Sequence, residues 1–151
     1  MQPMMDDLVE GAKEELKRAD HSLYVTLKYT RTVDVIKNII KRLISAYDIA
    51  IVDALRHLHT KKKIKEVPPG SKKRALLIAS SFSLLKKDID FYFLLRDLDV
   101  AEYTKREEYR KNVALITMVR GKQFVVDIET VKKYFDKTVE FVDHVHELIM
   151  R

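Results

Sequence analysis

The clearest hydrophobic pattern in the chain covers residues 32–59. Apolar residues recur there at steps of three and four, which places them on one face of a helix with 3.6 residues per turn. This stripe consists of Ile36, Ile40, Leu43, Tyr47, Ala50, Ala54 and Leu58. From Ile49 onward the opposite face also carries apolar side chains, Ile49 and Val52. We therefore expect the second half of this helix to meet partners on two sides, either other helices of a bundle or a second subunit.

A second helix is predicted for residues 128–149. Its apolar stripe consists of Ile128, Val131, Phe135, Thr138, Val142, Val145 and Ile149. Asp127 stands directly before this stripe, where a carboxylate can accept hydrogen bonds from the free amides of the first turn. Glu129 suits the positive end of the helix dipole. Asp127 is therefore the expected N-cap of this helix.

Three further helices are predicted with less sharp limits, over residues 7–29, 71–86 and 88–103. The break before residue 71 follows from Pro68 and Pro69, because proline lacks an amide hydrogen and disfavours helix in the residue before it. Gly70 then permits a turn, and we expect Ser71 to cap the helix that follows. Residues 61–70 are thus expected to form a loop between two helices.

Residues 113–126 fit two structures. Their β-branched residues, interrupted by Arg120, Gly121 and Lys122, are typical of a small hairpin. A helix over residues 106–119, ended by Gly121 in the left-handed position, fits as well. We favour the helix, because an isolated two-stranded hairpin is marginal unless it docks on a core. The predicted fold class is all-α: a single-domain helical bundle of about five helices over residues 1–151, with a small β-hairpin near 113–126 as the alternative.

Length and composition agree with one compact domain. A chain of 151 residues with 46% hydrophobic residues can form one contiguous core. No apolar run approaches the roughly 20 residues that span a bilayer, and the first residues have no basic and apolar leader pattern. We therefore expect a cytoplasmic protein without a membrane partner. The 34% of charged residues, with few Gln and Asn, is typical of thermophile proteins.

The basic residues are concentrated in one segment, residues 60–74, which we call the basic loop. Its cations are Lys61, Lys62, Lys63, Lys65, Lys72, Lys73 and Arg74. Glu66 is its one acid, so its charge of 7 − 1 = +6 equals the net charge of the whole chain, +6. The remaining residues carry as many acids as bases. This placement predicts an anionic partner.

The expected partner is RNA or DNA, contacted through its phosphates. Arg106, Arg110 and Lys111 could extend this surface, and Tyr109 between them could stack on a base. The alternative is a homodimeric interaction or scaffold protein, in which the basic loop is merely solvated. The two-sided apolar character of the helix after Ile49 motivates that alternative.

Several kinds of catalytic and cofactor site are excluded by the sequence. Its glycines, Gly11, Gly70 and Gly121, stand too far apart to form a phosphate cradle. There is no cysteine, and the serine-hydrolase elbow and the zinc helix motif are both missing. The histidine pairs His57/His59 and His144/His146 are spaced two apart, which points them to different sides of a helix. We therefore expect no metal site, no cofactor and no recognisable catalytic motif.

The order of these segments resembles the HEPN class of small helical domains, which act on nucleic acids or bind nucleotides in archaea and bacteria. The resemblance is carried by residues 45–50 (SAYDIA), the basic loop, residues 94–99 (LLRDLD), 101–103 (AEY) and 109–112 (YRKN). Active HEPN ribonucleases typically carry an arginine followed, after four to six residues, by a histidine. None of the five histidines of this chain has such an arginine. The resemblance therefore implies a non-catalytic or divergent member that binds nucleic acid.

Overall fold

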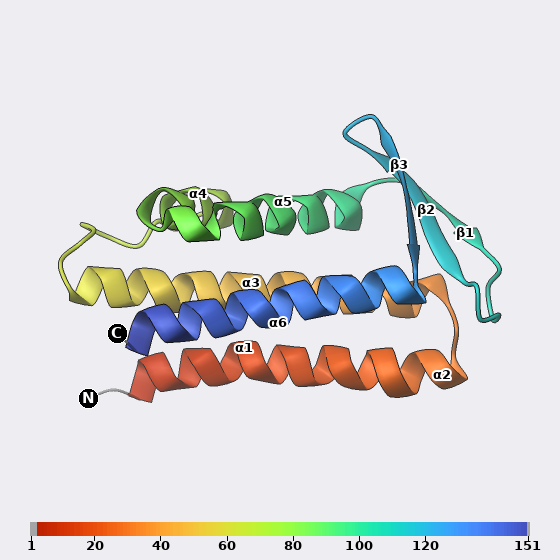
Figure 1. The fold of residues 1–151 in the computed structure, drawn as a ribbon, viewed down its shortest axis with the longest axis horizontal. Coiled ribbons are helices and arrows are strands. Elements are labelled where there is room, and N and C mark those ends of the chain that lie inside the picture. Colours follow the sequence, from red (N-terminus) through yellow and green to blue (C-terminus); the bar gives the residue numbers. More distant parts are fainter. Residues whose placement is uncertain (1–2, 151) are drawn as a thin grey trace.

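The computed structural model describes residues 3–150, with side chains described from Gly11 onward. The elements follow in the order α1 (Pro3–His21), a π-helical turn (Ser22–Thr26), α2 (Leu27–Tyr29), α3 (Val33–Thr60), α4 (Ser71–Ser81), a 3-10 turn (Ser83–Leu85), α5 (Lys86–Val100), β1 (Tyr103–Arg106), β2 (Ala114–Val119), β3 (Lys122–Asp127) and α6 (Ile128–Met150). Helices α1, α3 and α6 run alongside one another, α4 and α5 cover another side of α3, and the sheet stands at one end (Figure 1). The predicted helical bundle is confirmed, but the chain is not all-α.

Helix α3 is the centre of the bundle, and its predicted stripe is buried. Ile36, Leu43 and Tyr47 are fully buried, and the ring of Tyr47 stacks on Phe141 of α6 with 4.5 Å between centroids. On the side of Ile49, Gly11 of α1 comes so close that a Cβ atom at Gly11 would lie 3.4 Å from the Ile49 Cγ2. Helices of the same chain therefore pack on both sides of the second half of α3.

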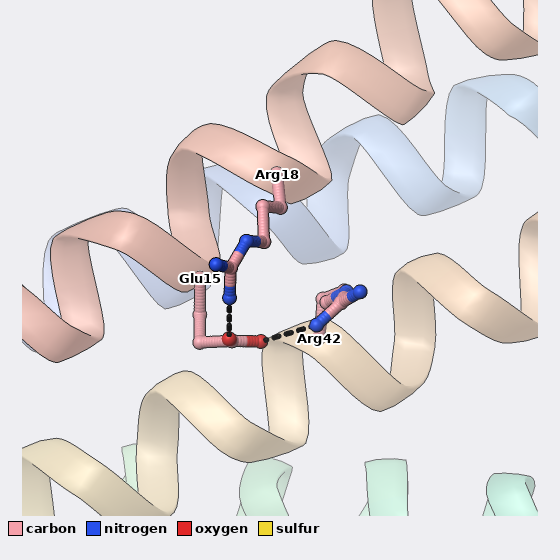
Figure 2. A network of polar contacts seen from close by, with 3 residues as sticks. All are labelled: Glu15, Arg18 and Arg42. Carbon is pink, nitrogen blue, oxygen red and sulfur yellow. Dashed lines mark hydrogen bonds and ion pairs between the residues drawn. The ribbon is translucent and has the colours of Figure 1, made fainter.

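A buried carboxylate ties α1 to α3. Glu15 of α1 is only 8% exposed and accepts hydrogen bonds from Arg18 at 2.9 Å and from Arg42 of α3 at 3.4 Å. Figure 2 shows both guanidinium groups approaching this one carboxylate. A buried charge needs such partners, because removal from water is otherwise strongly unfavourable.

The favoured helix over residues 106–119 is wrong, and the alternative hairpin forms instead. Strands β2 and β3 pair antiparallel through a two-residue turn, and β1 adds a third strand on the other side of β2. Arg120 and Gly121 both have positive φ, 55° and 75°, which matches the mirror-image turn that hairpins prefer. One face of the sheet, through Leu115 and Val119, packs into the helical core. This docking supplies the stability that an isolated hairpin lacks.

The limits of α4 and α5 differ from the predicted ones. Gly70, not Ser71, is the N-cap of α4, and no side chain caps it. Helix α4 ends at Ser81 because Phe82 is extended, while the hydroxyl groups of Ser80 and Ser81 both bond to the Leu77 carbonyl, a local bond that competes with helix continuation. Helix α5 ends at Val100, and the chain then turns into β1.

Candidate nucleic-acid interface

The basic loop begins in an ordered helix end, where α3 stops. The Lys63 amide donates to the Leu58 carbonyl at 2.9 Å, and the Lys62 amide donates to the His59 carbonyl at 3.0 Å. These two bonds define a Schellman motif, in which the residue after the C-cap has left-handed backbone geometry. Lys62 occupies that position with φ 61°, where glycine is the usual residue. The motif fixes the direction in which the loop leaves the helix.

Arg74 holds the other end of the loop. Its guanidinium donates hydrogen bonds to the carbonyl oxygens of Pro68, at 3.1 Å, and Pro69, at 2.6 Å. Two consecutive prolines also have fixed φ angles, so the chain from Pro68 to the start of α4 has little freedom. Arg74, which the sequence suggested as a phosphate contact, is therefore the internal support of the loop in this structure.

Six lysine side chains of the basic loop are exposed to solvent. They are Lys61, Lys62, Lys63, Lys65, Lys72 and Lys73. Among the residues whose side chains are described, none of the six lies within ion-pair distance of a carboxylate. At the end of α3, partial burial and the ammonium group of Lys61 together lower the pKa of His57. These lysines form a free cationic surface.

A shallow hollow of about 240 Å³ adjoins the basic loop. It is lined by Lys72, Phe93, Arg96, Asp97 and Val100. The guanidinium of Arg96 lies over Phe93 and Tyr92, at 6.0 and 5.5 Å from the ring centroids. Arg96 is not among the residues predicted from the sequence; its signal there is an arginine among the apolar residues of α5.

The other predicted contact residues lie at the opposite end of the molecule (Figure 1). The Tyr109 amide donates to the Arg31 carbonyl, just before α3 begins, whereas the basic loop follows the last residue of α3. A helix of 28 residues is about 42 Å long. The structure thus does not join Arg106, Tyr109, Arg110 and Lys111 to the basic loop in one surface.

These four residues differ in what they can contact. Tyr109, Arg110 and Lys111 are exposed, with 76% of Tyr109 accessible to solvent. Arg106 is half-buried, pairs with Glu107 at 3.6 Å and donates to the Asn112 carbonyl at 3.3 Å. Arg106 therefore shapes the β1–β2 connection, and the other three are available to a ligand.

The described residues contain no group of three or more His, Asp and Glu side chains that could hold a metal ion. In the same part of the chain, no helix combines the length and apolar character needed to cross a bilayer. Comparisons of the chain with protein-family models, with curated proteins and with solved structures each found no match. The HEPN resemblance therefore stays a hypothesis.

Proposed function

We propose that the protein binds nucleic acid through the basic loop and has no catalytic role there. The observation that carries this proposal is the group of six exposed lysines without a carboxylate partner in the described structure. Lysines so arranged attract phosphates and release condensed counterions when they bind, so that affinity falls steeply as salt is added. Such a surface contacts the nucleic-acid backbone and does not read the base sequence.

The fixed conformation at both ends of the basic loop supports a binding role. The Schellman motif at Lys62 and the Arg74 bonds to the prolines hold the loop at both ends, so less conformational freedom is lost when a ligand binds. A loop that served only solubility would need neither restraint. Packing within the chain accounts for part of the two-sided apolar character of α3 that motivates the homodimer alternative, because α1, α4, α5 and α6 all contact α3 and Ile49 packs against the core.

An electrophoretic shift experiment tests the proposal with single- and double-stranded RNA and DNA at 50 and 200 mM salt. The loop variant carries Lys61→Ala, Lys62→Ala, Lys63→Ala and Lys65→Ala. If all four lysines contact phosphates, the slope of log affinity against log salt should become smaller by about 3 to 4. The unchanged protein should bind nucleic acid at 50 mM salt and lose most of its affinity at 200 mM salt.

The matched control removes the same number of charges elsewhere, with Lys17, Lys86, Lys122 and Lys137 changed to Ala. These lysines are spread over α1, α5, β3 and α6. The control should bind more tightly than the loop variant at equal net charge. Equal weakening by both variants would mean that only net charge matters, and an absence of binding at 50 mM salt would refute the proposal.

A further inference from the structure

Three exposed tyrosines gather at the end of the bundle opposite the basic loop. Tyr24 lies in the π-helical turn, Tyr29 ends α2, and Tyr109 lies in the β1–β2 connection, with 53, 79 and 76% of their surfaces exposed. The hydrogen bond from the Tyr109 amide to the Arg31 carbonyl, 2.6 Å long, joins the last of these segments to the first two. These exposed rings offer flat surfaces to a ligand.

Cations accompany these rings. A hollow of about 180 Å³ is lined by Leu23, Tyr24, Leu27, Lys28, Arg31, Ile128 and Lys132. The Lys132 ammonium lies 5.5 Å from the Tyr24 ring centroid, and the Lys28 ammonium lies 5.9 Å from that of Tyr29. Lys132 has one ion-pair partner, Glu129 at 3.6 Å, while Lys28 and Arg31 have none among the described side chains. Three cations therefore line a hollow together with the apolar residues Leu23, Leu27 and Ile128.

Two backbone features hold this arrangement. The five residues Ser22–Thr26 form a π-helical turn, a rare geometry that occurs frequently at functional sites. Tyr109 has φ 68°, a left-handed conformation that is unfavourable for a bulky side chain. Such strain persists only where surrounding contacts enforce it, and it is concentrated at binding sites.

We infer that this tyrosine end is a second binding surface, which takes single-stranded nucleic acid. The hollow receives one phosphate group between Lys28, Arg31 and Lys132, and Tyr29 and Tyr109 stack on neighbouring bases. Alternating cations and aromatic rings are the usual means of binding single strands without sequence preference. In a duplex the base faces are covered by their neighbours, so stacking selects unpaired bases. The inference rests on the nucleic-acid binding in the proposed function, not on the basic loop as its site, and adds to it the kind of strand.

The test compares a fluorescently labelled 12-nucleotide single-stranded RNA with the same sequence as a duplex, using fluorescence anisotropy. Changing both Tyr29 and Tyr109 to Ala should weaken single-strand binding by at least about 25-fold, because each of the two stacked bases contributes about fivefold or more. Duplex binding should stay within about twofold. The control variant, Tyr29→Phe with Tyr109→Phe, keeps the aromatic faces and should bind the single strand like the unchanged protein.

The outcomes separate the two proposals. If the Ala and Phe variants both bind the single strand like the unchanged protein, the tyrosine end is not a stacking surface, whereas loss of binding in the loop variant would still support the proposed function. If the loop variant binds normally and the Ala variant does not, binding at the tyrosine end is supported and binding through the basic loop is refuted. If the unchanged protein binds neither strand form, both proposals are refuted. Both tyrosines are exposed, so all variants should fold, which circular dichroism checks.

Discussion

Lys62 occupies a position in which its side chain is unfavourable for folding. Its φ of 61° places it in the left-handed region, which is less favourable for an L-residue than the right-handed one by about 1–2 kcal/mol and is open to glycine. Yet it is one of the six exposed lysines of the basic loop. The two roles of the residue, in folding and in binding, can therefore be separated by a single substitution.

We expect Lys62→Gly to change stability and binding in opposite directions. Glycine relieves the left-handed strain but increases the freedom of the unfolded chain, so the net gain in the free energy of unfolding should be about 0.5–1 kcal/mol. Loss of one phosphate contact should reduce the salt slope of nucleic-acid binding by about one. Urea denaturation measures the first effect and binding at several salt concentrations the second.

The matched control is Lys65→Gly, because Lys65 carries the same charge without a positive φ. It should weaken binding comparably and give no gain in stability. A destabilising effect of Lys62→Gly would contradict the Schellman assignment. Equal affinity of the unchanged and Lys62→Gly proteins would instead remove Lys62 from the interface.

Asp127 connects β3 to α6 and shows how one side chain sets the start of an element. Its carboxylate accepts a hydrogen bond from the Thr130 amide at 2.8 Å, which confirms the predicted N-cap. Partial burial alone would raise the pKa of Asp127, but the backbone and side-chain hydrogen bonds of Thr130, with the charge of Arg106, outweigh it and lower the pKa. The charged carboxylate is therefore favoured in the folded protein.

Asp127→Ala should lower the free energy of unfolding by about 1 kcal/mol at pH 7. Since the folded pKa lies below the unfolded value of about 3.9, this contribution is present above that value and is lost as the pH falls through the folded pKa. The difference between the two proteins should accordingly shrink below about pH 4 in urea denaturation. Asp127→Asn keeps a capping oxygen without the charge and should retain most of the stability at pH 7. A difference that is constant from pH 7 to pH 3 would show that the charge is irrelevant.

The elements that could be predicted from the sequence are those whose signal is local. Helices α3 and α6 carry long apolar stripes, and Asp127 is a capping residue directly before α6. Periodicity and the capping residue were therefore enough to predict these helices. The 113–126 segment was ambiguous because its strands become stable only through β1 and the helical core, which no local pattern describes. The end of α4 depended on Phe82 and two serines, which the apolar pattern does not reveal.

The candidate surfaces also divide into features that are local in the sequence and features that depend on the fold. The basic loop is continuous in sequence, so its charge could be read directly, but the inward role of Arg74 could not. The tyrosine end is assembled from three separate segments, and only Tyr109 was singled out from the sequence. An acid-free stretch, residues 21–32, containing Tyr24, Lys28 and Tyr29, was the available signal. Its proximity to Tyr109 depends on the fold.

For the whole molecule, we expect a monomer at micromolar concentration. The main apolar stripe of α3 is buried within the chain, and Ile49 on its other side packs against the core. The most exposed large aliphatic and methionine side chains lie on different elements: Leu84 before α5, Val100 at the end of α5, Met118 on β2 and Met150 at the end of α6. A stable dimer needs a contiguous patch of several hundred Å² on each partner. Sedimentation velocity measures the mass, and a species near twice 17.7 kDa would restore the homodimer alternative.

The position of the chain ends has a practical consequence for all of these measurements. Helix α1 begins at Pro3 and α6 ends at Met150, both at the end of the bundle that carries the basic loop (Figure 1). A flexible tag fused to either end is tethered beside the lysines, at an effective concentration that reaches the millimolar range for short linkers. An acidic tag would compete with nucleic acid for the loop as an intramolecular inhibitor, and a cationic tag would add an artificial binding site. The affinities should therefore be measured on protein from which the tag has been cleaved.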